Sequence, residues 1–145
     1  MEIREILKAD LYKLSRLMVE VYNAPPWNDK WTEETALESL SDIYDFPNFT
    51  GNIIADGDEI LGALLGHSRR YADETTYYID EFFISEKYRR LGLGEKLYKT
   101  TIKQLKKKSI SGAFFTTLKN SPAYYFYTNE GAWDLEDSAC FYHKF

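Results

Sequence analysis

The residues whose types and spacing best suit a chemical role lie in one short stretch of the chain. An apolar run, Tyr77–Ile84, contains two adjacent carboxylates, Asp80 and Glu81, and the turn Arg89-Arg90-Leu91-Gly92-Leu93-Gly94 follows it. Glycines let a backbone approach a ligand closely, and the N–H groups at the start of a helix suit phosphate oxygens. The turn therefore predicts a phosphate-binding site between a strand and a helix.

Two well-known phosphate-binding patterns do not match this turn. A P-loop requires a Gly-Lys-Ser/Thr sequence that begins five residues after its first glycine, but Leu97 stands at that position after Gly92. A dinucleotide-binding fingerprint needs a third small residue, again at Leu97, and a parallel strand–helix–strand start. The glycine pair alone is thus weak evidence, and its meaning depends on the rest of the chain.

The spacing of apolar residues predicts alternating strands and helices along the whole chain. The expected strands lie near residues 3–6, 52–55, 60–66, 75–84, 113–118, 132–135 and 139–143, and the expected helices near 11–21, 33–44, 95–108 and 123–129. Asp10, Thr32 and Ser121 stand where helix caps are favoured. No repeat, low-complexity tract or linker interrupts the 145 residues, so we expect one domain spanning residues 1–145.

Charge is distributed unevenly over the sequence, whose formal net charge is −5. Residues 1–86 contain 18 acidic and 7 basic side chains, whereas residues 87–145 contain 5 and 11. This asymmetry predicts one region that attracts cations and another that attracts anions, although an unevenly charged solvated surface is an alternative explanation. The negative total argues against nonspecific binding to nucleic acid.

Several other classes of protein are disfavoured. No apolar run reaches about 18 residues, so we expect no membrane span. The first residues, Met1–Glu5, lack the pattern of a secretory signal, which favours a cytoplasmic protein. Cys140 is the single cysteine, and His67 and His143 are far apart in sequence. These counts exclude an internal disulfide and predict that the protein holds no metal.

Two motifs carry a resemblance to a known family. One is Arg89-x-x-Gly92-x-Gly94, between an apolar strand and an amphipathic helix, and the other is Asn120-Ser121-Pro122-Ala123-Tyr124-Tyr125-Phe126-Tyr127-Thr128-Asn129-Glu130-Gly131-Ala132. They resemble the two signatures of the GNAT superfamily of N-acetyltransferases, the second departing from it at Ala132, where phenylalanine is usual and where Trp133 stands adjacent. The resemblance implies an α+β fold with a mixed, mostly antiparallel central sheet of about seven strands flanked by about four helices. It also implies acetyl-CoA as the donor substrate.

The resemblance further implies roles in binding acetyl-CoA. Backbone N–H groups would hold the pyrophosphate, from the residues Arg89, Arg90, Leu91, Gly92, Leu93, Gly94 and Glu95. Phe82, Phe83 and Ile84 would pair with the pantetheine arm as if with a strand. Arg90 would add charge to phosphate binding, or simply be solvated. Asn120 would hydrogen-bond the pantetheine arm, or cap a helix.

The implied chemistry needs an acid and a base. Tyr127 matches the family's general acid, which protonates the departing thiolate. Attack on the thioester requires a neutral amine, so a carboxylate, directly or through water, must accept a proton. Asp80 and Glu81 are the candidates, but adjacent residues of a regular strand point to opposite faces, so both cannot face one pocket. The position three residues before Ile84, often Glu in the family, favours Glu81, with Asp80 as the alternative.

Local resemblances bear on the acceptor. Tyr78–Ile84 is similar to a segment of diamine and polyamine acetyltransferases, and Pro25–Thr32 resembles GNAT proteins grouped with aminoglycoside N-acetyltransferases. Both kinds of acceptor are polycationic, in agreement with the acidic residues 1–86. Four aromatic side chains would either wall the acceptor pocket or pack between helices: Tyr22, Trp27, Trp31 and Tyr44.

The resulting hypothesis is acetyl transfer to a primary amine of a small polycationic acceptor by direct attack. No covalent enzyme intermediate is expected, because Cys140 lies outside both motifs. The alternatives are acetylation of a protein or peptide amine, and a non-catalytic domain that binds acyl-CoA for regulation. Edge pairing of residues 138–144 would allow a homodimer.

Overall fold

Residues 1–145 are described by a computed structural model, in which the chain divides into two units, Met1–Phe115 and Thr116–Phe145. The strands of the first unit are β1 (Glu2–Glu5), β2 (Phe49–Asp56), β3 (Glu59–Arg70), β4 (Thr75–Ile84) and β5 (Gly112–Phe114). Its helices are α1 (Leu11–Tyr22), α2 (Glu33–Tyr44) and α3 (Leu93–Lys107), with short 3-10 turns at Lys8–Asp10 and Glu86–Tyr88. The second unit contains α4 (Pro122–Asn129).

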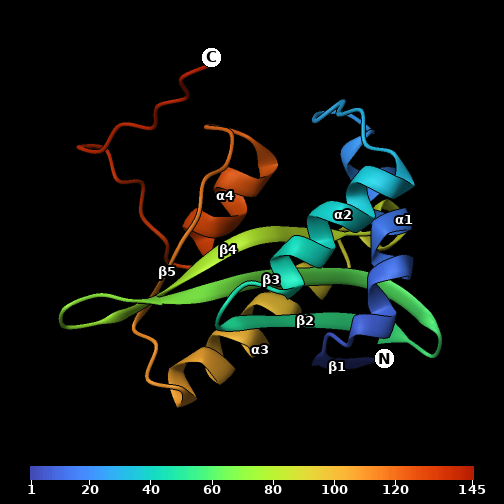
Figure 1. Ribbon diagram of the computed structural model, residues 1–145, viewed down its shortest axis with the longest axis horizontal. Helices are drawn as coiled ribbons and strands as arrows, with labels where there is room; N and C mark the ends of the chain where they lie inside the picture. The colour runs from blue at the N-terminus through green and yellow to red at the C-terminus, as the bar shows by residue number, and fades with distance from the viewer. The chain divides into compact units, whose positions relative to one another are not determined.

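The strands form one sheet in the order β1-β2-β3-β4-β5, and every pair is antiparallel except β4 and β5 (Figure 1). β5 pairs with β4 only from Thr76 to Tyr78. Beyond Tyr78, the end of β4 is paired with β3 and has no strand on its other side.

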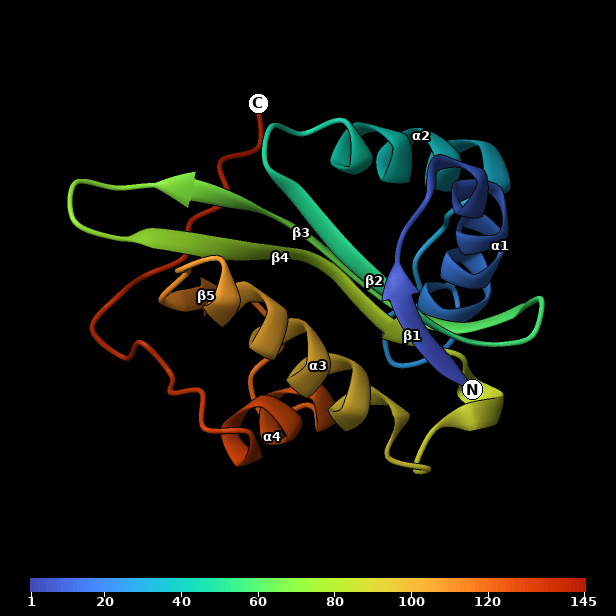
Figure 2. The same ribbon diagram turned by 90° about the horizontal axis from the view of Figure 1, so that it is seen from below.

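Helices cover both faces of this sheet (Figures 1 and 2). On one face, Leu14 and Met18 of α1 and Leu40 of α2 are fully buried in a core that includes Leu65. On the other face, Asn52 of β2 donates to Thr101 and Gln104 of α3 at 2.9 and 2.8 Å, and the rings of Phe82 and Tyr98 stack. Burial of each such apolar side chain contributes roughly 1.5–3 kcal/mol to the stability of the fold. Packing on both faces therefore holds the sheet, including β4, in place.

The predicted helix caps are confirmed at two positions and wrong at one. The Thr32 hydroxyl accepts from the backbone N–H of Thr35 at 3.1 Å, and that of Ser121 accepts from Tyr124 at 3.2 Å. Asp10 makes no side-chain cap bond to α1; its carboxylate accepts two bonds from the Arg4 guanidinium, at 2.8 and 2.9 Å, and one at 2.8 Å from the N–H of Leu7, before the 3-10 turn Lys8–Asp10. A charged, bidentate partner is stronger than a helix N–H, and the hydrogen bond from Arg4 lowers the pKa of Asp10.

The predicted α+β class, the mixed sheet and the four helices are confirmed, but the sheet has five strands rather than about seven. The strands predicted near 132–135 and 139–143 are not formed, and that predicted over 113–118 is limited to Gly112–Phe114. A strand needs a hydrogen-bonding neighbour as well as a suitable apolar pattern. Trp133, Phe141 and Tyr142 are instead exposed. The single domain and the homodimer stay predictions.

No helix combines the length and the apolar character needed to cross a membrane.

Candidate active site

An irregularity in β4 brings the two carboxylates to the same face of the sheet. The register passes from Leu65 opposite Glu81 to Gly66 opposite Ile79, so Asp80 is the extra residue of a β-bulge. Side chains alternate along a strand, so Leu65 and His67 lie on one face of β3. Glu81 is opposite Leu65 and Asp80 bonds to His67, so both carboxylates lie on that same face. The expectation that Asp80 and Glu81 must face opposite sides holds for a regular strand, and the bulge removes that restriction.

Asp80 is held by an imidazole from the neighbouring strand. Its Oδ2 lies 2.7 Å from Nδ1 of His67, and both side chains are mostly buried. The ring of Tyr78 stacks on His67 at 5.5 Å and 15°, and the ring of Phe46 meets the imidazole edge-on at 5.0 Å. These contacts fix the imidazole and, through it, the Asp80 carboxylate.

Glu81 has no such cationic partner in its surroundings. Burial raises the pKa of Glu81 to about 7, with a hydrogen bond from Tyr22 lowering it and the charges of Asp80 and Asp29 raising it further. A carboxylate that titrates near neutrality can accept a proton and release it again at physiological pH. Glu81 therefore has the protonation behaviour expected of a general base.

The loop between α1 and α2 places side chains beside Glu81. The Asn23 amide donates to the carbonyl of Trp31 and accepts from its N–H, both at 2.9 Å, and the Asp29 N–H donates to the carbonyl of Tyr22 at 2.9 Å. These bonds tie the loop to the end of α1. Asp29 and Tyr22 consequently lie close enough to Glu81 to shift its pKa.

The four aromatic side chains proposed to wall the acceptor pocket divide into two pairs. Trp27 meets Tyr22 edge-on at 5.9 Å, next to the position of Glu81. Trp31 and Tyr44 instead pack against the hydrophobic core, where the Tyr44 ring lies 5.0 Å from that of Phe49. The packing alternative therefore describes Trp31 and Tyr44, whereas Trp27 borders the site and Tyr22 does both, because its ring also packs on the core at Phe83.

The turn after β4 leads directly into α3. Arg90 and Gly92 have positive φ angles of 62° and 76°, and α3 begins at Leu93. The first N–H groups of a helix lack intrahelical acceptors. Arg89 and Arg90 are exposed beside them. The turn therefore presents backbone donors and positive charge at one place, as the sequence predicts for a site that holds a pyrophosphate.

Gly94 gives a test of whether this turn fits a ligand. A Cβ at Gly94 would lie 3.6 Å from Cγ1 of Ile84 and 3.8 Å from Cζ of Phe82, which are ordinary contacts. Its φ is not positive, and alanine is favoured over glycine inside a helix by roughly 0.5–1 kcal/mol. The protein's own packing does not require glycine here, and the close approach of a ligand to Gly94 stays a prediction.

Asn120 and Tyr127 belong to the second unit. Asn120 has a positive φ of 63°, and its Oδ1 accepts from the Tyr125 hydroxyl at 3.4 Å. The helix cap is the neighbouring Ser121, so the capping alternative for Asn120 is wrong. Tyr127 lies in α4. The roles of both residues toward acetyl-CoA stay predictions.

Sequence reasoning did not identify two residues of this site, His67 and Asp29. His67 follows an apolar strand run, and its partner Asp80 is reached across a bulge that no local sequence pattern reveals. Asp29 is one of many acidic residues in the first half of the sequence. Its proximity to Glu81 depends on the fold of the α1–α2 loop.

Comparisons with known proteins agree with this geometry. Residues 4–131 match the acetyltransferase (GNAT) family. No curated protein matches the chain. The matched segment is 128 residues long, from 4 to 131, and it includes both the turn after β4 and helix α4.

Solved structures of similar fold span nearly the whole chain. A possible acetyltransferase from Clostridium difficile 630 has a TM-score of 0.82 at 14% identity, covering 99% of this chain and 97% of its own. An aminoglycoside acetyltransferase from an uncultured soil metagenomic sample, in complex with sisomicin, has a TM-score of 0.77 at 21% identity. The match covers 99% of this chain and 95% of that protein's chain. A transcriptional regulator from Bacillus halodurans C-125 has a TM-score of 0.79 at 19% identity, and the match covers 99% of each chain. At these identities the likeness shows the shared fold.

Proposed function

The chain belongs to the acetyltransferase (GNAT) family, whose members use acetyl-CoA, and from this premise we propose that it acetylates a primary amine of a small polycationic acceptor. The observation that carries the proposal is Glu81, a partly buried carboxylate whose pKa is raised to about 7 beside Asp29 and Tyr22. Such a group can remove the proton that keeps an amine from attacking a thioester.

Glu81, rather than Asp80, is the proposed base. The Asp80 oxygen 2.7 Å from His67 is already engaged in a strong hydrogen bond or ion pair. Burial raises the pKa of Glu81, and Glu81 lies next to the loop residues that would contact the acceptor. In this proposal Asp80 acts on Glu81 through its charge and is a positioning residue.

The donor is proposed to bind along β4 and the following turn. Backbone N–H groups of Arg89–Glu95 would hold the pyrophosphate. Phe82–Ile84 would pair with the pantetheine arm on the side of β4 away from β3, where no strand follows β5. Asn120 would bond to the same arm. With acetyl-CoA bound, Glu81 would take one proton from the ammonium group, and the neutral amine would attack the thioester carbon. As the C–S bond breaks, Tyr127 would give its proton to the thiolate and regain the second proton that the nitrogen loses.

The polycationic acceptor is supported by charge and by one similar structure. Asp29, Asp80 and Glu81 supply negative charge at the proposed acceptor side, where Tyr22 and Trp27 offer aromatic surfaces to an amine. The aminoglycoside acetyltransferase of similar fold was solved with sisomicin, a small-molecule ligand. Peptide amines are the alternative acceptor, and a non-catalytic acyl-CoA-binding domain is the alternative function.

The test is acetyl-CoA-dependent release of free thiol in the presence of polyamines, aminoglycosides or peptides. We expect turnover with polycationic small molecules and a loss of kcat of about 100-fold or more in Glu81→Gln, because a positioned base contributes that much. Glu38→Gln, at an exposed carboxylate of α2, is the matched control and should retain wild-type kcat.

Other outcomes have distinct meanings. Turnover with peptides alone would refute the polycationic acceptor, and wild-type kcat in Glu81→Gln would refute the base. A Tyr127→Phe variant that loses kcat while keeping its affinity for CoA would support the proposed acid. Absence of turnover with every amine, together with tight CoA binding, would instead favour the non-catalytic domain.

A further inference from the structure

A hollow of about 390 Å³ lies in the first unit, at the opposite end of β4 from Glu81. It is bordered by the start of β2, the end of β3, the start of β4 and the residues that follow α3. Six residue steps separate Thr75, in its wall, from Glu81, or about 20 Å along a strand. The hollow is therefore separate from the proposed acetyl-transfer site.

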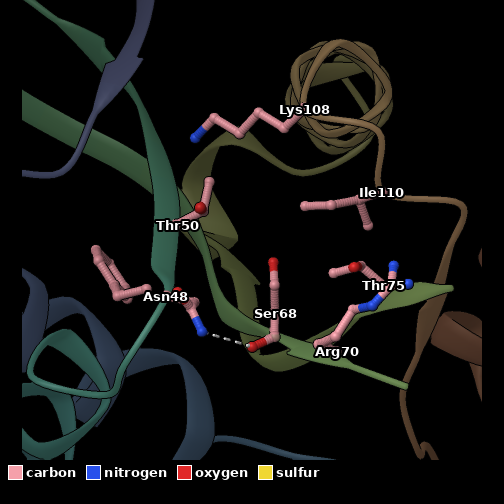
Figure 3. A pocket seen from close by; sticks show the side chains of 8 residues that line it. Asn48, Thr50, Ser68, Arg70, Thr75, Lys108 and Ile110 are labelled. Carbon is pink, nitrogen blue, oxygen red and sulfur yellow. Dashed lines mark hydrogen bonds between the residues drawn. The ribbon is translucent and has the colours of Figure 1, made fainter. Parts of the chain in front are cut away.

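The lining combines two cations with three hydroxyl groups. Figure 3 shows Lys108 reaching from the end of α3 toward β2, the Arg70 guanidinium beside Thr75, and the Ser68 hydroxyl pointing into the space between them. Thr50 adds its hydroxyl from the wall formed by β2. Lysine offers three donors and arginine five, and the hydroxyls can donate as well. The polar lining is thus rich in donors.

Neither cation is neutralised by the protein. Arg70 donates to the carbonyl of Ala72 at 3.2 Å, and no carboxylate lies within ion-pair distance of Arg70 or Lys108. Glu74 is the acidic neighbour of Thr75 in sequence, and its carboxylate accepts from Ser111 at 3.5 Å. Figure 3 shows Lys108 directed toward β2 and the Arg70 guanidinium beside Thr75, so each cation can attract an anion that enters the hollow.

The end of α3 does not oppose an anion strongly. The negative end of a helix dipole comes from its last carbonyl groups. Here the carbonyl of Leu105 accepts from the N–H groups of Lys108 and Ile110, and that of Lys106 accepts from Ser109. These two carbonyls are engaged within the protein, which reduces the negative charge that the end of α3 presents beside the ammonium group of Lys108.

We propose that this hollow binds a small organic anion, a carboxylate or a phosphate monoester on an apolar body. The oxygens would meet Arg70, Lys108 and the hydroxyl groups, and the apolar body would pack on Phe49 and Ile110. Its volume lies at the small end of the roughly 300–1,000 Å³ typical of ligand sites. The proposal is independent of acetyl transfer.

The experiment is a titration of the ¹⁵N-labelled full chain with inorganic phosphate, phenyl phosphate and benzoate, followed by NMR at constant ionic strength. We expect saturable shifts of the amides of Thr50, Ser68 and Thr75. The double variant Arg70→Gln/Lys108→Gln should weaken this binding about tenfold or more, because charge-assisted hydrogen bonds are lost. Lys106→Gln, at an exposed residue of the same helix end that does not line the hollow, is the matched control.

Phenyl phosphate tests for a phosphate monoester and benzoate tests for a carboxylate. Binding of either one supports the site. Phosphate bound at the Arg89–Glu95 turn would shift the amides of Gly92 and Gly94, so the two sites are measured separately. Shifts that do not saturate, that sodium chloride reproduces, or that Lys106→Gln weakens as much as the double variant would overturn the proposal.

Discussion

At the scale of single residues, the site depends on how burial and charge divide the roles of two adjacent carboxylates. Asp80 is paired with His67 at 2.7 Å, whereas burial raises the pKa of Glu81 to about 7. A buried acid whose pKa is raised toward neutrality is suited to take up and release a proton. The raised pKa of Glu81 also predicts a measurable effect on stability.

Glu81 should make the folded state less stable as pH rises. Its pKa is higher in the folded protein, about 7, than the ordinary value of 4.5, so folding favours the protonated form. The cost is absent below pH 4.5, grows between 4.5 and 7, and is complete above 7. Glu81→Gln should therefore unfold like wild type near pH 4.5 and be more stable by about 3 kcal/mol at pH 8. Urea denaturation at a series of pH values measures this difference, and a difference that is constant with pH would contradict it.

Asp80 should act on the reaction through Glu81. Its negative charge raises the pKa of Glu81, so Asp80→Asn should move the acid limb of the kcat/KM profile to lower pH. The asparagine can still accept a hydrogen bond from His67, which keeps the bulge in place. Activity at pH 8, where Glu81 is ionised in both proteins, should stay within a few-fold of wild type. Asp73→Asn, at the exposed tip between β3 and β4, should leave the profile unchanged.

At the scale of elements, the junction of β4 and α3 is where a prediction can separate function from folding. Gly94→Ala should fold as well as wild type or gain about 0.5–1 kcal/mol, because its Cβ meets only ordinary contacts. Its methyl group would stand where a phosphate approaches the backbone, so we expect the Kd for CoA to rise about tenfold or more. Calorimetry and thermal denaturation measure the two effects separately.

Gly112→Ala is the matched control for that variant. A Cβ at Gly112 meets nothing within 4 Å, and Gly112 lies at the start of β5. It should leave the Kd for CoA unchanged. Equal Kd values for Gly94→Ala and wild type would show that no ligand approaches the backbone at that glycine.

The elements also show which parts of the fold the sequence predicts. The bounds of β4 and α2 are predicted to the residue, and those of α4 to within one residue, because their caps and apolar patterns are local. The strand predicted near 139–143 has a suitable pattern but no neighbour, and the bulge at Asp80 depends on the register of β3. Properties that depend on pairing between distant segments, including the bond from His67 to Asp80, are therefore not accessible from local sequence.

At the scale of the whole first unit, the uneven charge of the sequence becomes a difference between the two faces of the sheet. Helix α2, on one face, contains four acidic residues and no basic ones, Glu33, Glu34, Glu38 and Asp42. Helix α3, on the other face, contains five lysines and a single acid, Glu95 (Figure 2). Summed charge of this kind steers ligands of opposite sign, and salt weakens it.

This arrangement predicts how the kinetics respond to salt. Between ionic strengths of about 0.02 and 0.2 M, the KM of a triamine should rise several-fold, and that of a monoamine should change little. The KM of acetyl-CoA, an anion bound beside Arg89 and Arg90, should also rise, while kcat for either amine stays constant. Initial rates at a series of sodium chloride concentrations measure all three. An equal salt response for triamine and monoamine would show that the acidic face does not attract the acceptor, and would leave the local carboxylates near Glu81 as the source of any preference for polycations.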